Sequence, residues 1–459
     1  MTATPADIYS PPAADVTAAG PRRWAVSPGA AKAVWAVAEQ GTFSLSNWLL
    51  QTLLANWLAD RAEFGAFSVA FAWFLLAGTV HNALVVEPMT VYGGARYAGR
   101  LRQYLGALAG GSLAVSAAVG LALAGVGAAY AAGGDPGVAV ACWSLAAAAP
   151  FVFLSWLMRR ASYVSGRPDR SAAAGAGYLL AMTGGFVLLH VAGRVTVPAA
   201  TAVMAISSAA AAAWLMRAER VRRPGADVDP GTGNSLVTDA RRDHWRFGRW
   251  AVLTGLAVMV VSQWYFLAAP WFVGVEAGGA LRALTNLFQP VMQAIVAFTA
   301  VLVPALARAA GTPRYGQLLR RAAALTTVGP AAAWLAGGLA AGPLVGLVYH
   351  GRYAEQASLL WLIGLQPVAA GAMMLAHARL CLADRPDRMF VASAASLAFT
   401  LTAGTALMYA GGLWGVAAAM PAAMAVDAAV SWYFVRAATA KGTPANATGA
   451  PAAAGQENR

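Results

Sequence analysis

The sequence predicts an all-α integral membrane protein of about twelve transmembrane helices, arranged as two six-helix lobes around a central cavity. Three observations predict this class: the composition, the placement of the basic residues, and a pattern that occurs in both halves of the chain. Only 11% of the residues are charged and 59% are hydrophobic, with a mean hydropathy of +0.57. Soluble domains carry roughly 25% charged residues, so most of this chain is suited to lipid.

The basic residues lie almost entirely on one side of the predicted membrane. Of the 32 Lys and Arg residues, all but four fall in the termini and in alternate connections between spans. The exceptions are Arg61, Arg194, Arg282 and Arg352. Positive charge marks cytoplasmic segments, so both termini are expected in the cytoplasm and the net charge of +13 is expected to contact anionic membrane lipids. The excess of Ala, Gly and Arg favours a bacterial cytoplasmic membrane, and no nucleic-acid partner is expected.

Five segments divide the chain. The first, 1–30, and the last, 438–459, are Ala/Pro-rich and are expected to be disordered cytoplasmic tails. Between them lie an N-lobe at 31–217, a polar cytoplasmic linker at 218–245, and a C-lobe at 246–437. The spans expected in the N-lobe are 31–58, 64–90, 103–132, 137–160, 172–192 and 196–217. Those expected in the C-lobe are 246–270, 276–304, 317–340, 355–379, 389–410 and 412–436.

The two lobes begin with the same pattern. Each has a Trp at the end of its first span, a Glu in the short outer turn, and a Pro near the inner end of its second span. These residues are Trp57, Glu63 and Pro88 in the first lobe and Trp271, Glu276 and Pro304 in the second. Their offsets agree within three residues. Because each lobe holds six helices and starts inside, the sequence predicts a parallel repeat about an axis along the membrane normal.

Two spans carry polar residues on one face. Gln40, Ser44, Asn47 and Gln51 follow one another at steps of four, three and four residues in the first span. Arg282, Asn286, Gln289 and Gln293 repeat the same steps in the eighth span. Such spacing places each set on one helix face. Charged residues in membrane helices rarely face lipid, so the two faces are predicted to form two walls of a polar cavity.

The cavity residues suggest a substrate with anionic and sugar groups. Arg282 stays charged and binds phosphate or carboxylate through its fork of donors; alternatively it extends outward or pairs with Glu276 or Glu63. The amides suit sugar hydroxyls, although amides in membrane helices also bond one helix to another. His81 and Asn82 in the second span extend the candidate substrate site, although a lone His in a packed helix is more often a core residue.

Three carboxylates fall well inside apolar spans: Glu39, Glu87 and Asp427. Burial favours the neutral form of a carboxyl group, so these residues are candidates for carrying a proton or holding a cation during transport. Glu39 shares the first polar helix and is the first choice, whereas Glu87 and Asp427 could instead pair with arginines near the inner interface. The two cysteines and five histidines have no metal-ligand spacing, so no metal or cofactor is expected.

Five stretches resemble polysaccharide-biosynthesis flippases of the multidrug/oligosaccharidyl-lipid/polysaccharide exporter superfamily, which includes O-antigen flippases and peptidoglycan lipid flippases. They are Glu39–Gln–Gly–Thr–Phe–Ser–Leu–Ser–Asn47, Glu63–Phe–Gly–Ala–Phe67, Leu84–Val–Val–Glu–Pro88, Ala280–Leu–Arg–Ala–Leu–Thr–Asn286 and Gly351–Arg–Tyr–Ala–Glu355. The resemblance extends over 30–437 and rests on the order and spacing of these stretches. It implies two lobes facing each other across a cavity lined by the first, second, seventh and eighth helices. It also implies rocking between inward-open and outward-open states.

The substrate class that the resemblance implies is a polyprenyl-pyrophosphate-linked glycan, as in O-antigen or exopolysaccharide synthesis. The peptidoglycan lipid flippases carry several cavity arginines, whereas only Arg282 is a clear candidate here. The expected function is therefore flipping of a lipid-linked oligosaccharide, with the polymerase and glycosyltransferases of the same pathway as possible partners. The first alternative is an exporter of small amphipathic or cationic compounds. A membrane glycan polymerase or glycosyltransferase is disfavoured, because the outer loops are short and have no paired carboxylates. We therefore expect a transporter and not an enzyme.

Overall fold

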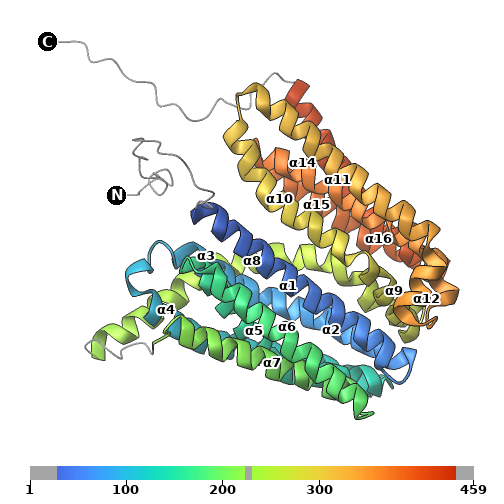
Figure 1. The fold of residues 1–459 in the computed structure, drawn as a ribbon, viewed down its shortest axis with the longest axis horizontal. Helices are drawn as coiled ribbons and strands as arrows, with labels where there is room; N and C mark the ends of the chain where they lie inside the picture. The colour runs from blue at the N-terminus through green and yellow to red at the C-terminus, as the bar shows by residue number, and fades with distance from the viewer. Residues whose placement is uncertain (1–27, 223–229, 441–459) are drawn as a thin grey trace, which may run out of the picture.

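The computed structural model describes residues 28–222 and 230–440, and this part of the chain is helical without strands (Figure 1). The first half holds α1 (Pro28–Trp57), α2 (Arg61–His81), α3 (Glu87–Tyr92), α4 (Leu101–Ala132), α5 (Pro136–Val164), α6 (Pro168–Val191) and α7 (Val197–Ala218). The second half holds α8 (Pro230–Phe272), α9 (Val275–Leu287), α10 (Gln289–Ala309), α11 (Pro313–Leu339), α12 (Ala341–Tyr349), α13 (Leu360–Ile363), α14 (Leu365–Leu382), α15 (Pro386–Phe399) and α16 (Thr405–Ala440). Short π-helical turns at Asn82–Val86 and Thr400–Gly404 join α2 to α3 and α15 to α16.

The prediction of about twelve membrane helices in two lobes is confirmed. Within the described residues, ten helical segments are long and apolar enough to cross a membrane. One of them, Pro386–Ala437, is two helices, because Gly412 has a non-helical backbone with φ 55° and ψ −134°. The helix α1 is 30 residues long and carries the polar face, and it brings the number to twelve. Ten of the twelve lie within about five residues of the expected spans. The seventh span begins at 236 instead of 246, and the eighth is divided into α9 and α10 at Phe288.

The two lobes meet at one end and separate at the other (Figure 1). The first lobe, α1 to α7, and the second lobe, α10 to α16, diverge where α1 begins and converge around α9 and α12. The sequence predicts that α1 begins in the cytoplasm, so the end at which the lobes separate would be the inner end.

Glycines make the close approach at the converged end possible. A Cβ on Gly279 of α9 would lie 2.9 Å from the backbone nitrogen of Gly65 on α2. A Cβ on Gly65 would lie 2.2 Å from the carbonyl oxygen of Val275. Both approaches are to backbone atoms that cannot turn aside, so only glycine allows α2 and α9 to cross at this distance. The crossing joins the two lobes at this end.

The segment predicted to be a linker, 218–245, is partly helical. The structure describes 230–245 as the first turns of α8, which runs without a break into the membrane-spanning part. Leu236 and Ala240 are buried against Tyr97 and Tyr104 of the first lobe. These two apolar positions are four residues apart, as on one face of a helix. The surrounding Arg and Asp residues made the segment look like a polar linker in the sequence. The linker at 218–245 stays a prediction, and its residues 223–229 lie outside the described residues.

The predicted tails lie mostly outside the described residues. Only their inner ends are described, and these extend α1 back to Pro28 and α16 forward to Ala440. The outer segment between the ninth and tenth spans contains a short helix, α12, which ends at His350 in the left-handed conformation.

Candidate substrate cavity

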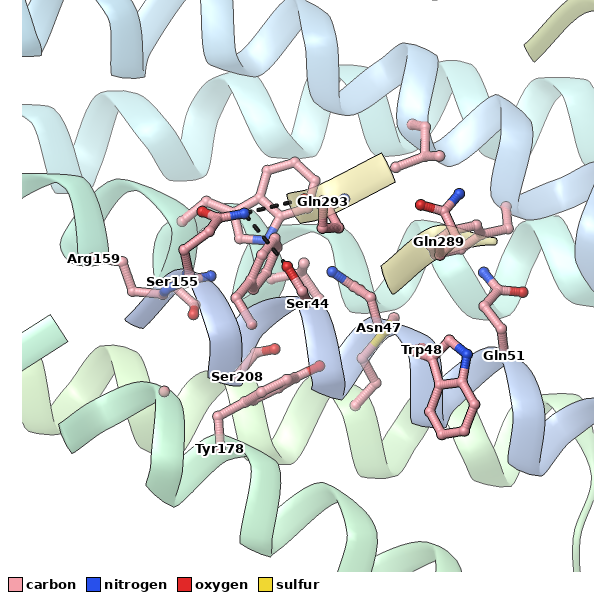
Figure 2. A pocket seen from close by; sticks show the side chains of 18 of the residues that line it. Ser44, Asn47, Trp48, Gln51, Ser155, Arg159, Tyr178, Ser208, Gln289 and Gln293 are labelled. Atoms are coloured by element: carbon pink, nitrogen blue, oxygen red, sulfur yellow. Dashed lines mark hydrogen bonds between the residues drawn. The ribbon is translucent and has the colours of Figure 1, made fainter. Parts of the chain in front are cut away.

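A cavity of about 420 Å³ lies between helices of the first lobe and the first helices of the second half (Figure 2). Its lining comes from α1, α2, α5, α6 and α7, and is completed by α8, α9 and α10 of the second half. None of the lining residues belongs to α11 through α16. The first, second, seventh and eighth helices do line it, as the family resemblance implies. The cavity is not shared equally between the lobes, however, because the fourth, fifth and sixth helices supply the wall opposite α10.

Both predicted polar faces reach this cavity. Gln40, Ser44, Asn47 and Gln51 line it from α1, and Arg282, Asn286, Gln289 and Gln293 line it from α9 and α10. Figure 2 shows Asn47 on α1 and Gln289 on α10 among the side chains that line the cavity. The amide oxygen of Gln51 is buried and has no hydrogen-bond partner among the described residues. These side chains therefore have hydrogen-bonding capacity that a ligand in the cavity can use.

The same two faces also touch directly at two points. The side-chain nitrogen of Gln40 donates to the amide oxygen of Gln293 over 3.2 Å. The side-chain nitrogen of Asn286 donates to the carbonyl oxygen of Trp48 over 3.1 Å and to the hydroxyl of Thr52 over 3.0 Å. The interhelical hydrogen bonds that the sequence left open thus occur, and they close the cavity on the side where α1 meets α9 and α10.

Arg282 is buried beside the cavity and pairs with no carboxylate in the described part of the chain. Its Nη2 donates to the side-chain oxygen of Gln263 over 3.1 Å, and its guanidinium lies 3.5 Å from the ring centre of Phe266. The Nε atom is buried and has no hydrogen-bond partner among the described residues. The alternative pairing with Glu63 is not seen, since that carboxylate accepts from the backbone nitrogens of Ala59 and Val197. Arg282 is therefore a desolvated cation with a donor free for an anion.

Sequence reasoning missed two arginines in the cavity lining. Arg159 and Arg160 were expected in a cytoplasmic loop, because the fourth span was taken to end at 160. In the structure α5 continues to Val164, so both residues lie on the helix about one turn before its end and line the cavity. The sequence does contain a signal that places both arginines on the helix: the residues after Arg160 are compatible with a helix and include no Gly or Pro until Gly166.

Glu39 is held in a network at the α5 side of the cavity. Its carboxylate forms an ion pair with Arg159, which donates from both Nε and Nη2. The hydroxyl of Tyr163 donates to the other carboxylate oxygen over 2.8 Å, and Ser171 adds a weaker bond of 3.3 Å. The Arg159 guanidinium also lies 3.9 Å from the ring centre of Phe43. Glu39 thus lines the cavity, but its charge is already compensated.

The remaining residues of the second span separate into two groups. Asn82 lines the cavity and donates to the carboxylate of Glu87 over 2.8 Å. His81 is placed elsewhere than expected for a substrate contact: it is fully buried, and its Nε2 lies 2.8 Å from the hydroxyl of Ser112 on α4. Its ring stacks on Phe153, with 5.1 Å between centres. His81 is therefore a core residue, which was the alternative that the sequence offered. Neither His81 nor Glu87 belongs to the cavity lining.

Asp427 belongs to a buried polar cluster in the second lobe, away from the cavity. It accepts hydrogen bonds from His377 over 2.7 Å, from Ser393 over 3.0 Å and from Ser431 over 3.1 Å. These partners lie on α14, α15 and α16. The expected alternative, a pairing with loop arginines, is replaced by a pairing with a histidine. The coupling roles of Glu39, Glu87 and Asp427 stay predictions.

The charges that line the cavity favour an anion. Arg159, Arg160 and Arg282 contribute three positive charges, and Glu39 contributes one negative charge. The cations lie in different parts of the lining, since Arg159 of α5 pairs with Glu39 of α1, whereas Arg282 of α9 lies beside Phe71 of α2 and Phe266 of α8. Neutral amides and the rings of Trp48, Trp156 and Tyr178 occupy the space between and around them. No cluster of metal-ligating side chains occurs within the described ranges.

No protein-family model and no curated protein sequence matches this chain. Solved structures of transporters do match it. An inward-facing multidrug resistance MATE family transporter of the MOP superfamily superposes with a TM-score of 0.71 at 14% identity, over 90% of this chain and 99% of that one. The lipid II flippase MurJ, in an inward closed conformation, superposes with a TM-score of 0.65 at 11% identity, over 88% of this chain and 87% of that one.

A third similar structure is a MOP superfamily transporter from Pyrococcus furiosus, described by the reverse polarity of its binding pocket. It has a TM-score of 0.61 at 14% identity and covers 90% of this chain and 96% of its own. Sequence identity this low establishes the fold and leaves the substrate open. The chain is thus a multi-pass membrane protein with the fold of MOP-superfamily transporters and flippases.

Proposed function

We propose that this protein moves a polyprenyl-pyrophosphate-linked oligosaccharide from the inner to the outer leaflet of a bacterial cytoplasmic membrane by alternating access. The observation that carries the proposal is Arg282, a buried guanidinium beside the cavity with no carboxylate partner and a free Nε donor. A buried cation without a counter-ion is costly, and an anionic substrate group would supply the missing charge. The pyrophosphate of a lipid-linked glycan is such a group.

The rest of the cavity supports a substrate that combines phosphate with sugar. Asn47, Gln51 and Gln289 offer donors and acceptors for sugar hydroxyls, and Trp48 and Tyr178 offer flat surfaces for sugar rings. The volume of about 420 Å³ lies within the usual range for small-ligand sites, roughly 300–1,000 Å³. It would hold a pyrophosphate with the first sugars.

The ion that drives transport is proposed to bind at the carboxylates inside the spans. Glu39 touches the cavity directly and would connect substrate binding to ion binding. Asp427 is hydrogen-bonded to His377, so this pair can hold a proton within the second lobe. Glu87 bonds to the cavity residue Asn82 and is the third candidate.

An exporter of small amphipathic compounds is the second candidate function. It is favoured by the aromatic part of the lining, which includes Phe43, Phe71 and Trp156. Cationic compounds fit less well, because the lining has two more positive than negative charges. The two functions therefore differ in the charge of the substrate.

The test is a chromosomal knockout with analysis of the lipid-linked saccharides that accumulate. We expect lipid-linked glycan to build up in the inner leaflet of the knockout, and the wild-type gene to reverse this. Arg282→Gln should fail to restore export although the protein inserts normally, and Arg282→Lys should restore it only in part, because lysine keeps the charge without the fork.

Arg321→Gln, at an exposed position on α11, is the matched control and should restore export fully. Normal glycan export by the knockout itself would refute the proposed function. Full export by Arg282→Gln would remove this residue from the site.

A further inference from the structure

A second concave site lies at the inner ends of α3 and α8 and shares no lining residue with the substrate cavity. This α3–α8 groove has a volume of about 550 Å³. It is lined by Tyr92, Arg96, Asp243, Arg246, Phe247, Trp250, Ala251 and Thr254. None of these residues has a part in the proposed transport function, so the groove needs an explanation of its own.

The groove lies at the depth of lipid headgroups. Tyr92 is the last residue of the second span, and Arg96 follows in the connection that the sequence predicts to be cytoplasmic. Trp250 comes early in the membrane-spanning part of α8 and is 64% exposed. Trp and Tyr prefer the boundary between water and hydrocarbon, and arginines near it reach the phosphate layer. A ligand in this groove would therefore meet both the polar and the apolar layer of the inner leaflet.

The polar end of the groove is cationic. The carboxylate of Asp243 accepts two hydrogen bonds. Arg96 Nη1 donates to one oxygen over 2.8 Å, and the hydroxyl of Tyr97 donates to the other over 2.7 Å. Burial, aided by the bond to Asp243, raises the pKa of Tyr97, so this hydroxyl stays a donor. Within the described ranges Arg246 has no recorded ion pair or hydrogen bond. One uncompensated guanidinium therefore remains, together with the other nitrogens of the half-exposed Arg96.

The other end of the groove is apolar and stays open. Phe247 packs edge-on against Tyr92, with 6.3 Å between ring centres, and forms the floor. Trp250 and Ala251 continue this wall toward the membrane interior along α8. A phosphate-bearing head would contact Arg246 and Arg96, while a hydrocarbon chain would lie against the aromatic rings. A free phosphate or a neutral lipid would use only one of the two ends.

We propose that the α3–α8 groove is a binding site for an anionic phospholipid of the inner leaflet. The phosphate accepts from Arg246 and Arg96, and an acyl chain packs on Phe247, Trp250 and Ala251. The proposal does not depend on the transported substrate.

The bound lipid would also favour the observed arrangement of the lobes. The inner part of α8 is fastened to the first lobe, where His244 Nδ1 lies 2.9 Å from the carbonyl oxygen of Leu84. Farther along, Trp264 Nε1 of α8 donates to the hydroxyl of Thr405 in the second lobe over 2.9 Å. The helix α8 thus spans both lobes, and a lipid between its inner end and α3 holds that end in place.

The experiment measures lipid binding by the purified full-length protein in a neutral detergent, using native mass spectrometry and the midpoint of thermal unfolding. Phosphatidylglycerol is compared with phosphatidylcholine of the same acyl chains and with inorganic phosphate. We expect phosphatidylglycerol to bind and to raise the midpoint more than phosphatidylcholine does, and inorganic phosphate to have no effect. Arg246→Gln should weaken phosphatidylglycerol binding about fivefold, the usual effect of one basic residue near an anionic membrane surface.

Two further variants separate a defined site from a generally basic surface. Arg241→Gln, on the same helix and exposed but outside the groove, should bind phosphatidylglycerol as the wild type does. Trp250→Ser, at an exposed position, should weaken phosphatidylglycerol binding without lowering the midpoint of the lipid-free protein. Equal loss in the Arg241 and Arg246 variants would overturn the proposal, as would equal binding of the two lipids. A midpoint increase by inorganic phosphate alone would also refute a lipid site.

Discussion

The two lobes have the same order of six helices but treat their buried polar groups differently. In the first lobe Glu39 and Arg159 pair at the edge of a cavity. In the second lobe Asp427 and the partly exposed His377 pair between α14, α15 and α16. The repeated scaffold is therefore compatible with either an open or a filled interior, and side-chain size decides between them.

Small residues keep the interior of the first lobe open. Ser155, Ala174, Gly175, Ser208 and Ala211 line the far wall of the cavity from α5, α6 and α7. In the second lobe the large side chain of Trp432 bonds to the carbonyl oxygen of Ala372 over 3.1 Å, and the guanidinium of Arg379 lies 5.7 Å from its ring centre. The comparison shows how one lobe can offer a binding site while its repeat serves another purpose. Three substitutions test it.

The largest effect is expected for Arg159→Ala in the first lobe. This change leaves the Glu39 carboxylate buried beside the cavity without its cation, which should lower the free energy of unfolding by about 3 kcal/mol. The measurement is chemical or thermal unfolding in detergent. The double variant Glu39→Gln/Arg159→Gln should recover most of the loss, because two neutral amides can bond to each other. Wild-type stability of Arg159→Ala would show that water in the cavity already solvates the pair.

A smaller effect is expected for Asp427→Ala in the second lobe. It removes the acceptor for His377, Ser393 and Ser431, which should cost about 2 kcal/mol, less than the loss of a charge pair because all three donors are neutral when His377 is unprotonated. Asp427→Asn keeps the shape and should reduce the loss. In vesicles, Asp427→Asn should also make glycan export less responsive to an imposed proton gradient, whereas Arg282→Gln should reduce export at every gradient. An unchanged gradient response in Asp427→Asn would place coupling elsewhere.

The smallest effect on stability is expected where the lobes meet. Arg352, after α12 in the second lobe, donates to the carbonyl oxygens of Ala55, Asn56, Leu58 and Ala59 at the end of α1, over 2.8–3.2 Å. A cation at the last turn of a helix contributes up to about 1 kcal/mol at exposed sites. Arg352→Ala should therefore shift the equilibrium toward the outward-open state about fivefold.

This shift can be followed with a membrane-impermeant thiol reagent added from outside, which reacts with a cysteine placed at the cavity residue Gln51 in a background without Cys142 and Cys381. The labelling rate should rise about fivefold in Arg352→Ala. Arg194→Ala, at another exposed position expected on the outer side, is the control and should leave the rate unchanged. Equal labelling in all three proteins would show that the glycine crossing of α2 and α9 keeps this end closed by itself.

The candidate site was predictable where one helix carried the whole signal. The four-three-four spacing on α1 and on α9–α10 placed eight polar residues on two helix faces, and all eight line the cavity. The site was not predictable where the role of a residue depends on its contacts with another helix or on where its own helix ends. Arg159 looks like a loop residue until α5 is seen to continue to Val164, and His81 looks like a site residue until its contact with Ser112 of α4 is seen.

The sequence by itself determined the class of this protein: a membrane-spanning helical chain with two repeated halves and two polar helix faces. Hydropathy, charge placement and helical spacing are local properties of the sequence, and they do not depend on how the helices pack against one another. Only the tertiary structure decided that most of the cavity lining comes from the first lobe, that Glu39 is neutralised by Arg159, and that Arg282 has no counter-ion among the described residues. These outcomes depend on contacts between helices that lie far apart in the sequence. In a low-dielectric interior the charges on neighbouring helices determine which buried charges are compensated.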